Sequence, residues 1–172
     1  MEKHEFIQWV EDYDNELHQK QSVNGITLDL QYTPHSYLLI QRKGSELEYP
    51  PSSDDGGEMI YFTLRLWVDD QSVDVFDYKA ISVEDKQRKL YYFSYLFQED
   101  IHLRSCEQNR NVALFHFERS NLKPQKTFVI AFESPDQIEK CESLTFEITS
   151  DIINSLPVKF NINIKDIPTL TL

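Results

Sequence analysis

The sequence predicts a mainly β domain, a β-sandwich or a strongly bent antiparallel sheet, with two or three short peripheral helices. Two short runs of β-branched and aromatic residues, 112–117 and 128–132, contain no glycine or proline. Such runs are typical of central strands covered on both faces. The loop between them is polar and contains Pro124, so we expect the two strands to pair in the middle of the sheet.

The first periodic stretch, residues 4–17, predicts an N-terminal helix. Its apolar residues recur at helical spacing and would share one face: Phe6, Trp9, Val10, Tyr13 and Leu17. The remaining positions are rich in acidic residues, whereas a helix that lies on a membrane carries Lys and Arg on its polar face. We therefore expect this helix to cover the core.

A hairpin and a second helix follow. Residues 26–32 alternate between apolar and polar side chains, as a half-buried strand does. Asn24 and Gly25 precede this strand, and both tolerate the positive φ of a tight hairpin turn. Thr33 and Pro34 then resemble a helix cap and a first helical residue, which predicts a short helix from residue 35 to residue 41.

Residues 59–68 form the longest predicted strand, in which both faces carry large side chains. Residues 73–78 predict a further strand. Ser82 is placed to cap a helix over residues 83–90, whose acidic residues come first and basic residues last. The apolar run 91–97 is expected to leave that helix and become a strand that continues through residue 103.

The C-terminal half begins with residues 105–111, which we expect to form a polar turn. After the central pair, residues 134–142 predict a loop. Strict alternation predicts strands at residues 144–148 and 158–164. The segment between these strands suggests one helical turn, and residues 167–172 suit an edge strand or an anchored tail.

Length and charge limit the classes of function. The chain has 172 residues, which fits one domain spanning residues 1–172. Its formal net charge is −12, which repels nucleic-acid phosphates and anionic lipid headgroups. We therefore expect no nucleic-acid partner. No segment approaches the roughly 20 apolar residues of a membrane-spanning helix.

The two cysteines, Cys106 and Cys141, leave two alternatives open. They allow one disulfide, yet two free thiols are equally compatible with their spacing. Neither lies in a CxxC motif, so a metal or redox site built on cysteine is not expected.

Searches for catalytic motifs give no candidate, and we expect a protein that is not an enzyme and that holds no cofactor or metal. One metal alternative is a zinc site at His102, His116 and Glu118, if the two histidines face each other across neighbouring strands. A glycan-acting enzyme is a second alternative, because acids and aromatics are abundant, but it needs two carboxylates flanking a cleft. A carbohydrate-binding module that stacks aromatic rings on sugars is a third.

A candidate partner surface lies around residues 45–58, a long acidic segment with two prolines and two glycines. Loops of this length without secondary structure are commonly functional. The segment leads into the strand whose outer face carries Tyr61, Arg65 and Trp67, the residue types that anchor many interfaces. We name these three residues together with Asp54 and Asp55 as the predicted partner surface.

Five segments, residues 6–41, 61–66, 91–103, 114–133 and 157–172, resemble an uncharacterised group of Gram-negative cell-envelope lipoproteins. The resemblance includes a W-V-x-D-x-x-N-x-L pattern, carried here by Trp9, Val10, Asp12, Asn15 and Leu17.

In that group a signal peptide and a lipid-modified cysteine precede the first helix. The resemblance therefore implies that Met1 replaces these elements and that the native protein carries an N-terminal lipid. It implies a cell-envelope location, on an unspecified side of the outer membrane. It also implies a role in binding or assembly, with another envelope protein or a surface glycan as partner.

Overall fold

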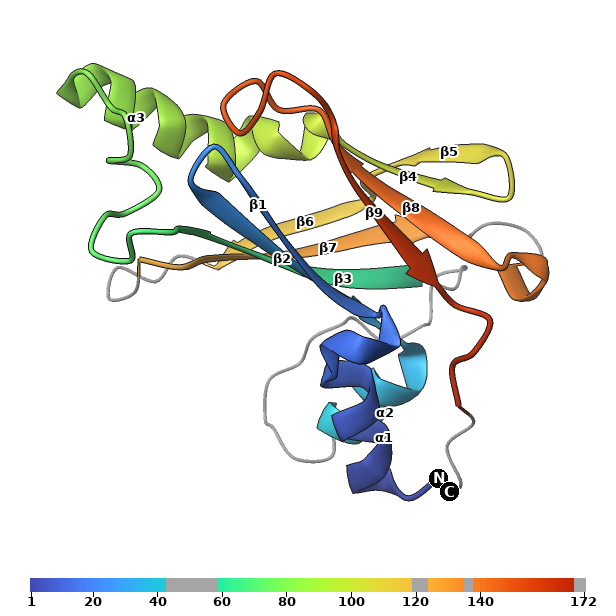
Figure 1. Ribbon diagram of the computed structural model, residues 1–172. Helices are drawn as coiled ribbons and strands as arrows, with labels where there is room; N and C mark the ends of the chain where they lie inside the picture. Colours follow the sequence, from blue (N-terminus) through green and yellow to red (C-terminus); the bar gives the residue numbers. More distant parts are fainter. Residues whose placement is uncertain (43–58, 119–123, 135–137, 169–172) are drawn as a thin grey trace.

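Nine strands in the described part of the chain form two antiparallel sheets that pack face to face (Figure 1). The computed structural model describes residues 1–42, 59–118, 124–134 and 138–168. The mainly β fold expected from the sequence is therefore confirmed, and the arrangement is that of a β-sandwich. The segment 45–58, with Asp54 and Asp55, lies outside the described residues.

The larger sheet has the strand order β1-β2-β3-β7-β6. Its strands are β1 (His18–Val23), β2 (Ile26–Thr33), β3 (Met59–Val68), β7 (Lys126–Glu133) and β6 (Leu114–Glu118). The tight hairpin expected at Asn24 and Gly25 joins β1 to β2, and both residues have positive φ, 52° and 78°. The longest predicted strand is β3, which lies in the centre of this sheet.

The smaller sheet has the order β5-β4-β8-β9. Its strands are β4 (Ile101–Ser105), β5 (Gln108–Asn111), β8 (Ser143–Ile148) and β9 (Val158–Asn163). Residues 105–111, expected to be only a turn, contain β5. Cys106 and Glu107 both take positive φ and reverse the chain within two residues, which leaves the next four free to pair with β4.

Aromatic side chains fill the space between the sheets. Phe62 on β3 lies 5.0 Å, centroid to centroid, from Phe146 on β8, and Phe132 on β7 lies 5.9 Å from the same ring. All three rings are fully buried. Burial of such rings supplies much of the hydrophobic stabilisation of a domain, because each removes a large apolar area from water.

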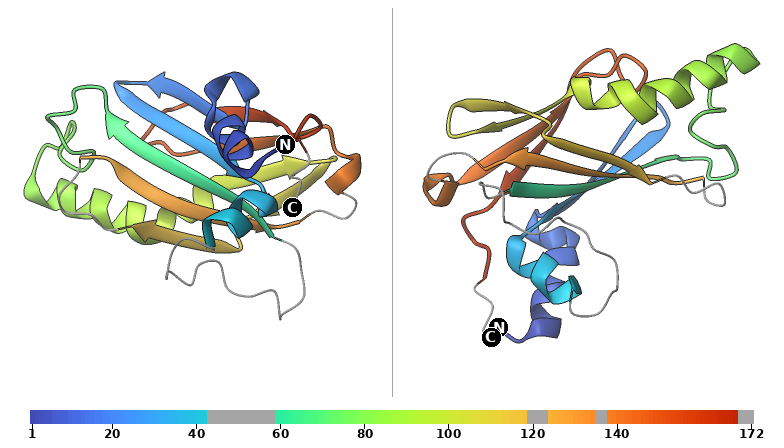
Figure 2. Two further views of the ribbon diagram at one scale, coloured as in Figure 1. Left: turned by 90° about the horizontal axis from the view of Figure 1, so that it is seen from below. Right: turned by 180° about the vertical axis from the view of Figure 1, so that it is seen from behind.

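The helices lie at opposite ends of the sandwich (Figures 1 and 2). α1 (Lys3–Glu11) and α2 (His35–Arg42) pack at one end, and α3 (Val83–Tyr91) lies at the other. The first helix was expected to reach residue 17 but ends at Glu11. Asp12 adopts an extended conformation, and its carboxylate accepts a hydrogen bond from the backbone N–H of Asp14, which starts a 3₁₀ turn, Tyr13–Asn15.

The strand expected at residues 73–78 is wrong, because this segment is a series of turns. The carboxylate of Asp74 accepts a hydrogen bond from the N–H of Phe76, and the carbonyl of Asp74 accepts from Asp77 and Tyr78. An aspartate that bonds its own backbone two residues on competes with strand pairing. The apolar side chains Val75 and Phe76 still enter the core.

The strand expected at residues 91–97 is also wrong. The helix continues from α3 through a π-helical segment, Tyr92–Leu96, and a 3₁₀ segment, Phe97–Asp100. Phe93 and Phe97 are four residues apart, so a helical backbone directs both rings into the core. The apolar run thus supplies a buried helical stripe.

The strand expected in the middle of the sheet near residues 112–117 lies at the edge, as β6. It pairs with β7 as expected, and Phe117 stacks on Phe128 with ring centroids 4.9 Å apart. Phe115 and Phe117 are only partly buried, because no strand follows β6 in the described sheet. The rings of Phe115 and Phe117 contact Phe128, and these contacts hold an aromatic strand at the edge of the sheet.

Two glutamines link the edges of the two sheets. The side-chain amides of Gln19 and Gln21, on β1, donate hydrogen bonds to the backbone carbonyls of Asn161 and Lys159, on β9. β1 and β9 are edge strands of different sheets. Side chains therefore connect two strands that do not form a ladder with each other.

The structure joins Cys106 and Cys141 in a disulfide, with the two Cα atoms 5.5 Å apart. Cys106 lies in the turn between β4 and β5, and Cys141 follows the short 3₁₀ segment Ile138–Lys140. The bond decides between the two alternatives that the cysteine spacing left open.

Candidate functional site

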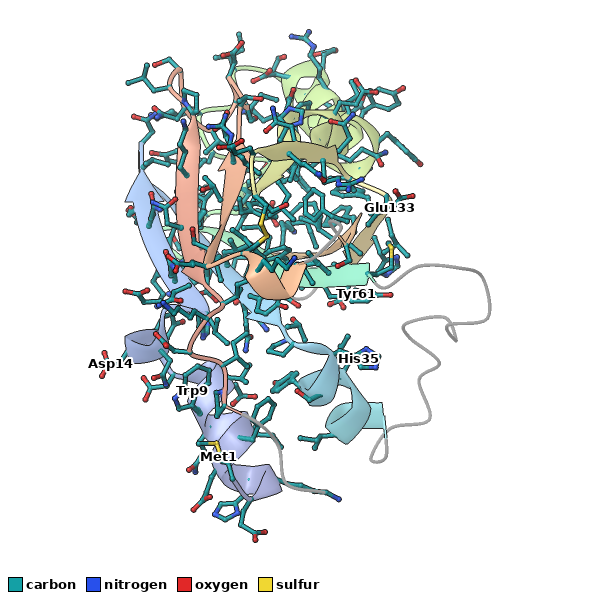
Figure 3. The ribbon with its side chains drawn as sticks, turned by 90° about the vertical axis from the view of Figure 1, so that its right-hand side faces the viewer. Met1, Trp9, Asp14, His35, Tyr61 and Glu133 are labelled. Carbon is teal, nitrogen blue, oxygen red and sulfur yellow. A yellow bond between two sulfur atoms is a disulfide. The ribbon has the colours of Figure 1, made fainter. Side chains whose placement is uncertain are left out.

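The predicted partner residues of β3 do not form one cluster. Tyr61 is only 8% exposed, and Trp67 lies about 20 Å further along the strand, at about 3.4 Å per residue. Trp67 is partly exposed, and the ammonium of Lys20 lies 5.5 Å from its ring centroid. Figure 3 shows Tyr61 near Glu133, at the end of the strand where His35 also lies.

Arg65, the third predicted residue, belongs to a polar cluster centred on Asp29. A carboxylate oxygen of Asp29 lies 2.8 Å from Nε2 of His18 and accepts a hydrogen bond of 2.9 Å from the hydroxyl of Tyr13. The guanidinium of Arg65 lies 3.4 Å from the other oxygen. Asp29 is only 3% exposed, so this carboxylate depends on these partners for its solvation.

The cluster shifts the pKa values of its members. Burial alone would raise the pKa of Asp29, but contact with His18, the Tyr13 hydroxyl and the charge of Arg65 together hold it below its usual value. Burial and the hydrogen bond to Asp29 raise the pKa of Tyr13 to about 12. Asp29 is thus ionised and Tyr13 neutral near pH 7.

This arrangement anchors the N-terminal segment to the larger sheet. Nδ1 of His18 lies 2.8 Å from the carbonyl oxygen of Glu11, the last residue of α1. The ring of Tyr13 stacks on that of His18 with centroids 3.9 Å apart. Because these contacts join the N-terminal segment to β1 and β2, we assign the cluster a structural role.

A groove of about 500 Å³ lies where β2, β3 and the C-terminal segment meet. Its polar side chains include His35, Lys140, Lys165 and Glu142, and its apolar ones include Met59, Ile60 and Ile164. Lys165 and Glu142 pair at 3.2 Å. Glu142 is the one carboxylate among the described residues that line the groove, so they do not supply the pair that a glycosidase needs.

The residues of the zinc alternative lie on different sheets. His102 is on β4 of the smaller sheet, where Nδ1 lies 3.2 Å from the amide oxygen of Asn111. His116 and Glu118 are on β6 of the larger sheet. The expectation that the two histidines face each other across neighbouring strands is therefore wrong. Within the described ranges no group of three potential ligands is placed to hold a metal ion.

Six of the ten exposed large hydrophobic residues in the described part of the chain lie on α3 or beside it. None of the nine residues of α3 is buried. Exposed side chains of this helix, of the residue pair before it and of the π-helical segment define what we name the α3 surface: Ile81, Val83, Leu90, Tyr91, Tyr95 and Leu96. Tyr91 and Tyr95 are each more than half exposed, with ring centroids 5.2 Å apart. Exposed apolar groups gathered on one element commonly mark an interaction site.

Polar contacts explain why α3 shows its apolar side chains to solvent. The ammonium of Lys86 lies 2.6 Å from the carboxylate of Asp77, and that of Lys89 donates a 2.7 Å hydrogen bond to the carbonyl of Tyr78. Ser82 caps the helix by accepting a hydrogen bond from the N–H of Asp85. Lys86 and Lys89 therefore face the turns of residues 73–80, and α3 projects beyond the sheets (Figures 1 and 2).

The sequence reasoning found the helix and its cap but missed this surface. The signal was present in the spacing of residues 90–97. A helical continuation places Phe93 and Phe97 on one side and Tyr91 and Tyr95 on another. Interpreting the run as a strand concealed that separation.

Comparisons of the chain with protein-family models, with characterised proteins and with solved structures give no match. Among the helices that the structure describes, none has the length and apolar content needed to cross a bilayer.

Proposed function

We propose that this protein is a non-enzymatic domain of a cell-envelope lipoprotein that acts in binding or assembly through the α3 surface. The observation that carries the proposal is a helix of nine residues with none buried, beside which Ile81 is 93% exposed. The chain carries a net charge of −12, and 27% of its residues are charged, so charged residues are available to cover its surface. Apolar groups held in water on a capped and ion-paired helix are best explained by a partner that covers them.

Two further observations support the envelope location. The disulfide between Cys106 and Cys141 is of the kind that persists in oxidising compartments, such as the bacterial periplasm. The sequence also resembles envelope lipoproteins over most of its length.

Under this proposal the lipid precedes α1, which lies at the end of the sandwich opposite α3 (Figure 1). The α3 surface then points away from the anchored end.

Site-specific photo-crosslinking tests the binding role. A photo-reactive phenylalanine analogue at Tyr91, in the native envelope, is expected to give discrete adducts after irradiation. The same analogue at Asp14, exposed near α1, serves as the control (Figure 3). The binding role fails if position 91 gives no adduct beyond those at position 14.

Mass spectrometry of the native protein from membranes tests the lipoprotein assignment separately. We expect an N-terminal cysteine that carries acyl chains. An unmodified chain recovered from the soluble fraction would contradict this part of the proposal.

A further inference from the structure

We propose that the partner of the α3 surface is a second copy of this chain, with the two α3 helices packed antiparallel about a two-fold axis. This inference rests on the proposed function and names its partner. Two-fold symmetry requires a surface that is complementary to itself. The apolar residues of the α3 surface and the charged residues of α3 beside them both meet this requirement.

The apolar residues are placed at both ends of the helix. Val83 lies in the first turn, and Leu90 and Tyr91 lie in the last. Val83 and Leu90 are seven residues apart and share a face with Tyr91, which is eight residues from Val83. In an antiparallel pair, Val83 of one copy meets the Leu90 and Tyr91 end of the other.

The charges follow the same symmetry. Glu84 and Asp85 lie in the first turn, and Arg88 and Lys89 lie in the last. Glu84 and Arg88 are four residues apart on one flank of the apolar stripe. An antiparallel pair therefore places Glu84 of each copy against Arg88 of the other, and such flanking charges set the orientation of paired helices.

The charges on the other flank already have partners within the chain. Lys86 pairs with Asp77, and Lys89 pairs with Asp85 at 3.7 Å. Arg88 differs, because its side chain is 77% exposed and its guanidinium is 4.0 Å from Asp85, the outer limit of an ion pair. Arg88 can therefore turn to a carboxylate of a second copy at little cost.

An anionic bilayer fits this surface less well. Glu84 lies beside the apolar stripe, and the whole chain carries a net charge of −12. A helix that inserts into a membrane surface carries basic residues along both flanks. The first turn of α3 is acidic and the last turn is basic. The helix is therefore complementary in charge to an antiparallel copy of itself.

Sedimentation of the purified protein tests the inference. We expect a reversible monomer–dimer equilibrium at physiological ionic strength, weak because one helix supplies a small contact area. Leu90→Glu and Tyr91→Glu should each abolish the dimer, because they place a charge within the apolar contact. Both side chains are exposed, at 42% and 56%, so both variants should melt as the wild type does.

Charge reversal provides the sharper test. Glu84→Arg and Arg88→Glu should each weaken the dimer by roughly tenfold, because two symmetric ion pairs become repulsive. The double variant E84R/R88E should restore the wild-type dissociation constant, since both copies then carry the reversed pair. Asp14→Arg changes the net charge as Glu84→Arg does, and it should leave the equilibrium unchanged.

A monomeric wild type at all concentrations overturns the inference, and so does a double variant no better than its single parents. Crosslinking from Tyr91 to a different protein, with the purified chain monomeric, also overturns it while leaving the proposed binding function intact. If position 91 crosslinks to no protein at all, both the dimer and the proposed binding function are contradicted.

Discussion

Nε2 of His18 lies 2.8 Å from the carboxylate of Asp29, while Nδ1 of the same ring lies 2.8 Å from the carbonyl oxygen of Glu11. Both ring nitrogens thus lie close to oxygen atoms, one on a side chain and one on the backbone. The ring connects the end of α1 to a buried position on β2. The N-terminal helix is consequently attached through these polar contacts as well as through Phe6 and Val10 in the core.

Asp29→Ala should lower the free energy of unfolding by about 3 kcal/mol, because it leaves His18, Tyr13 and Arg65 without their common acceptor. Urea denaturation monitored by fluorescence measures the change. Asp14→Ala, at an exposed position near α1, is the control and should alter stability by less than about 0.5 kcal/mol. Equal losses in both variants would show that the cluster contributes no special stabilisation.

The stability supplied by Asp29 should depend on acid pH. Its pKa in the folded state lies below the model-peptide value of about 3.9, so the contribution is fully present above pH 4 to 5. It is lost as the pH falls through the folded-state pKa. The difference in unfolding free energy between wild type and Asp29→Ala, measured from pH 7 to pH 2.5, should shrink at the acid end. A constant difference over that range would contradict the assigned ionisation.

Phe128→Ala should destabilise the protein by about 4 kcal/mol, because the ring is fully buried between the sheets. Phe117→Ala, on the edge strand β6, should cost roughly half as much, because its ring is only partly buried. Thermal melts and urea titrations of both variants make the comparison. A larger loss for Phe117→Ala would mean that β6 is more central than its edge position indicates.

Removal of the disulfide should lower stability by about 3 to 4 kcal/mol in the chain-entropy account, because Cys106 and Cys141 are separated by 35 residues. The variant with both cysteines replaced by alanine should show this loss. Added reductant should destabilise the wild type by the same amount. The reductant should not affect the double variant, which is the matched control. If the wild type is insensitive to reductant, the bond contributes little.

The strands that the sequence predicted best were those with regular alternation. Residues 59–68 and 158–163 form β3 and β9, because one buried face and one wetter face leave a clear period of two. The hairpin at Asn24 and Gly25 and the cap at Ser82 were predictable because these residues carry their own local geometry.

The errors arose where tertiary contacts decide between local alternatives. Residues 91–97 are apolar at nearly every position, so neither period dominates, and burial of Phe93 and Phe97 selects the helix. At residues 73–78 the carboxylate of Asp74 accepts a hydrogen bond from the backbone N–H of Phe76, and the alternation of apolar and polar residues does not reveal this turn. Part of the α3 surface was missed for the same reason, since Tyr95 and Leu96 join it only because the helix continues past Tyr91.

The hydrogen bonds from Gln19 and Gln21 to β9 have a consequence for how the molecule behaves at high concentration. An edge strand offers a row of backbone groups on which another chain can add a strand, and repeated addition leads to fibres. Here the carbonyls of Lys159 and Asn161 are already occupied by side chains from β1. A foreign strand would have to displace both amides before it could pair with β9. The two glutamines thus hinder the addition of a foreign strand at β9, the edge of the smaller sheet.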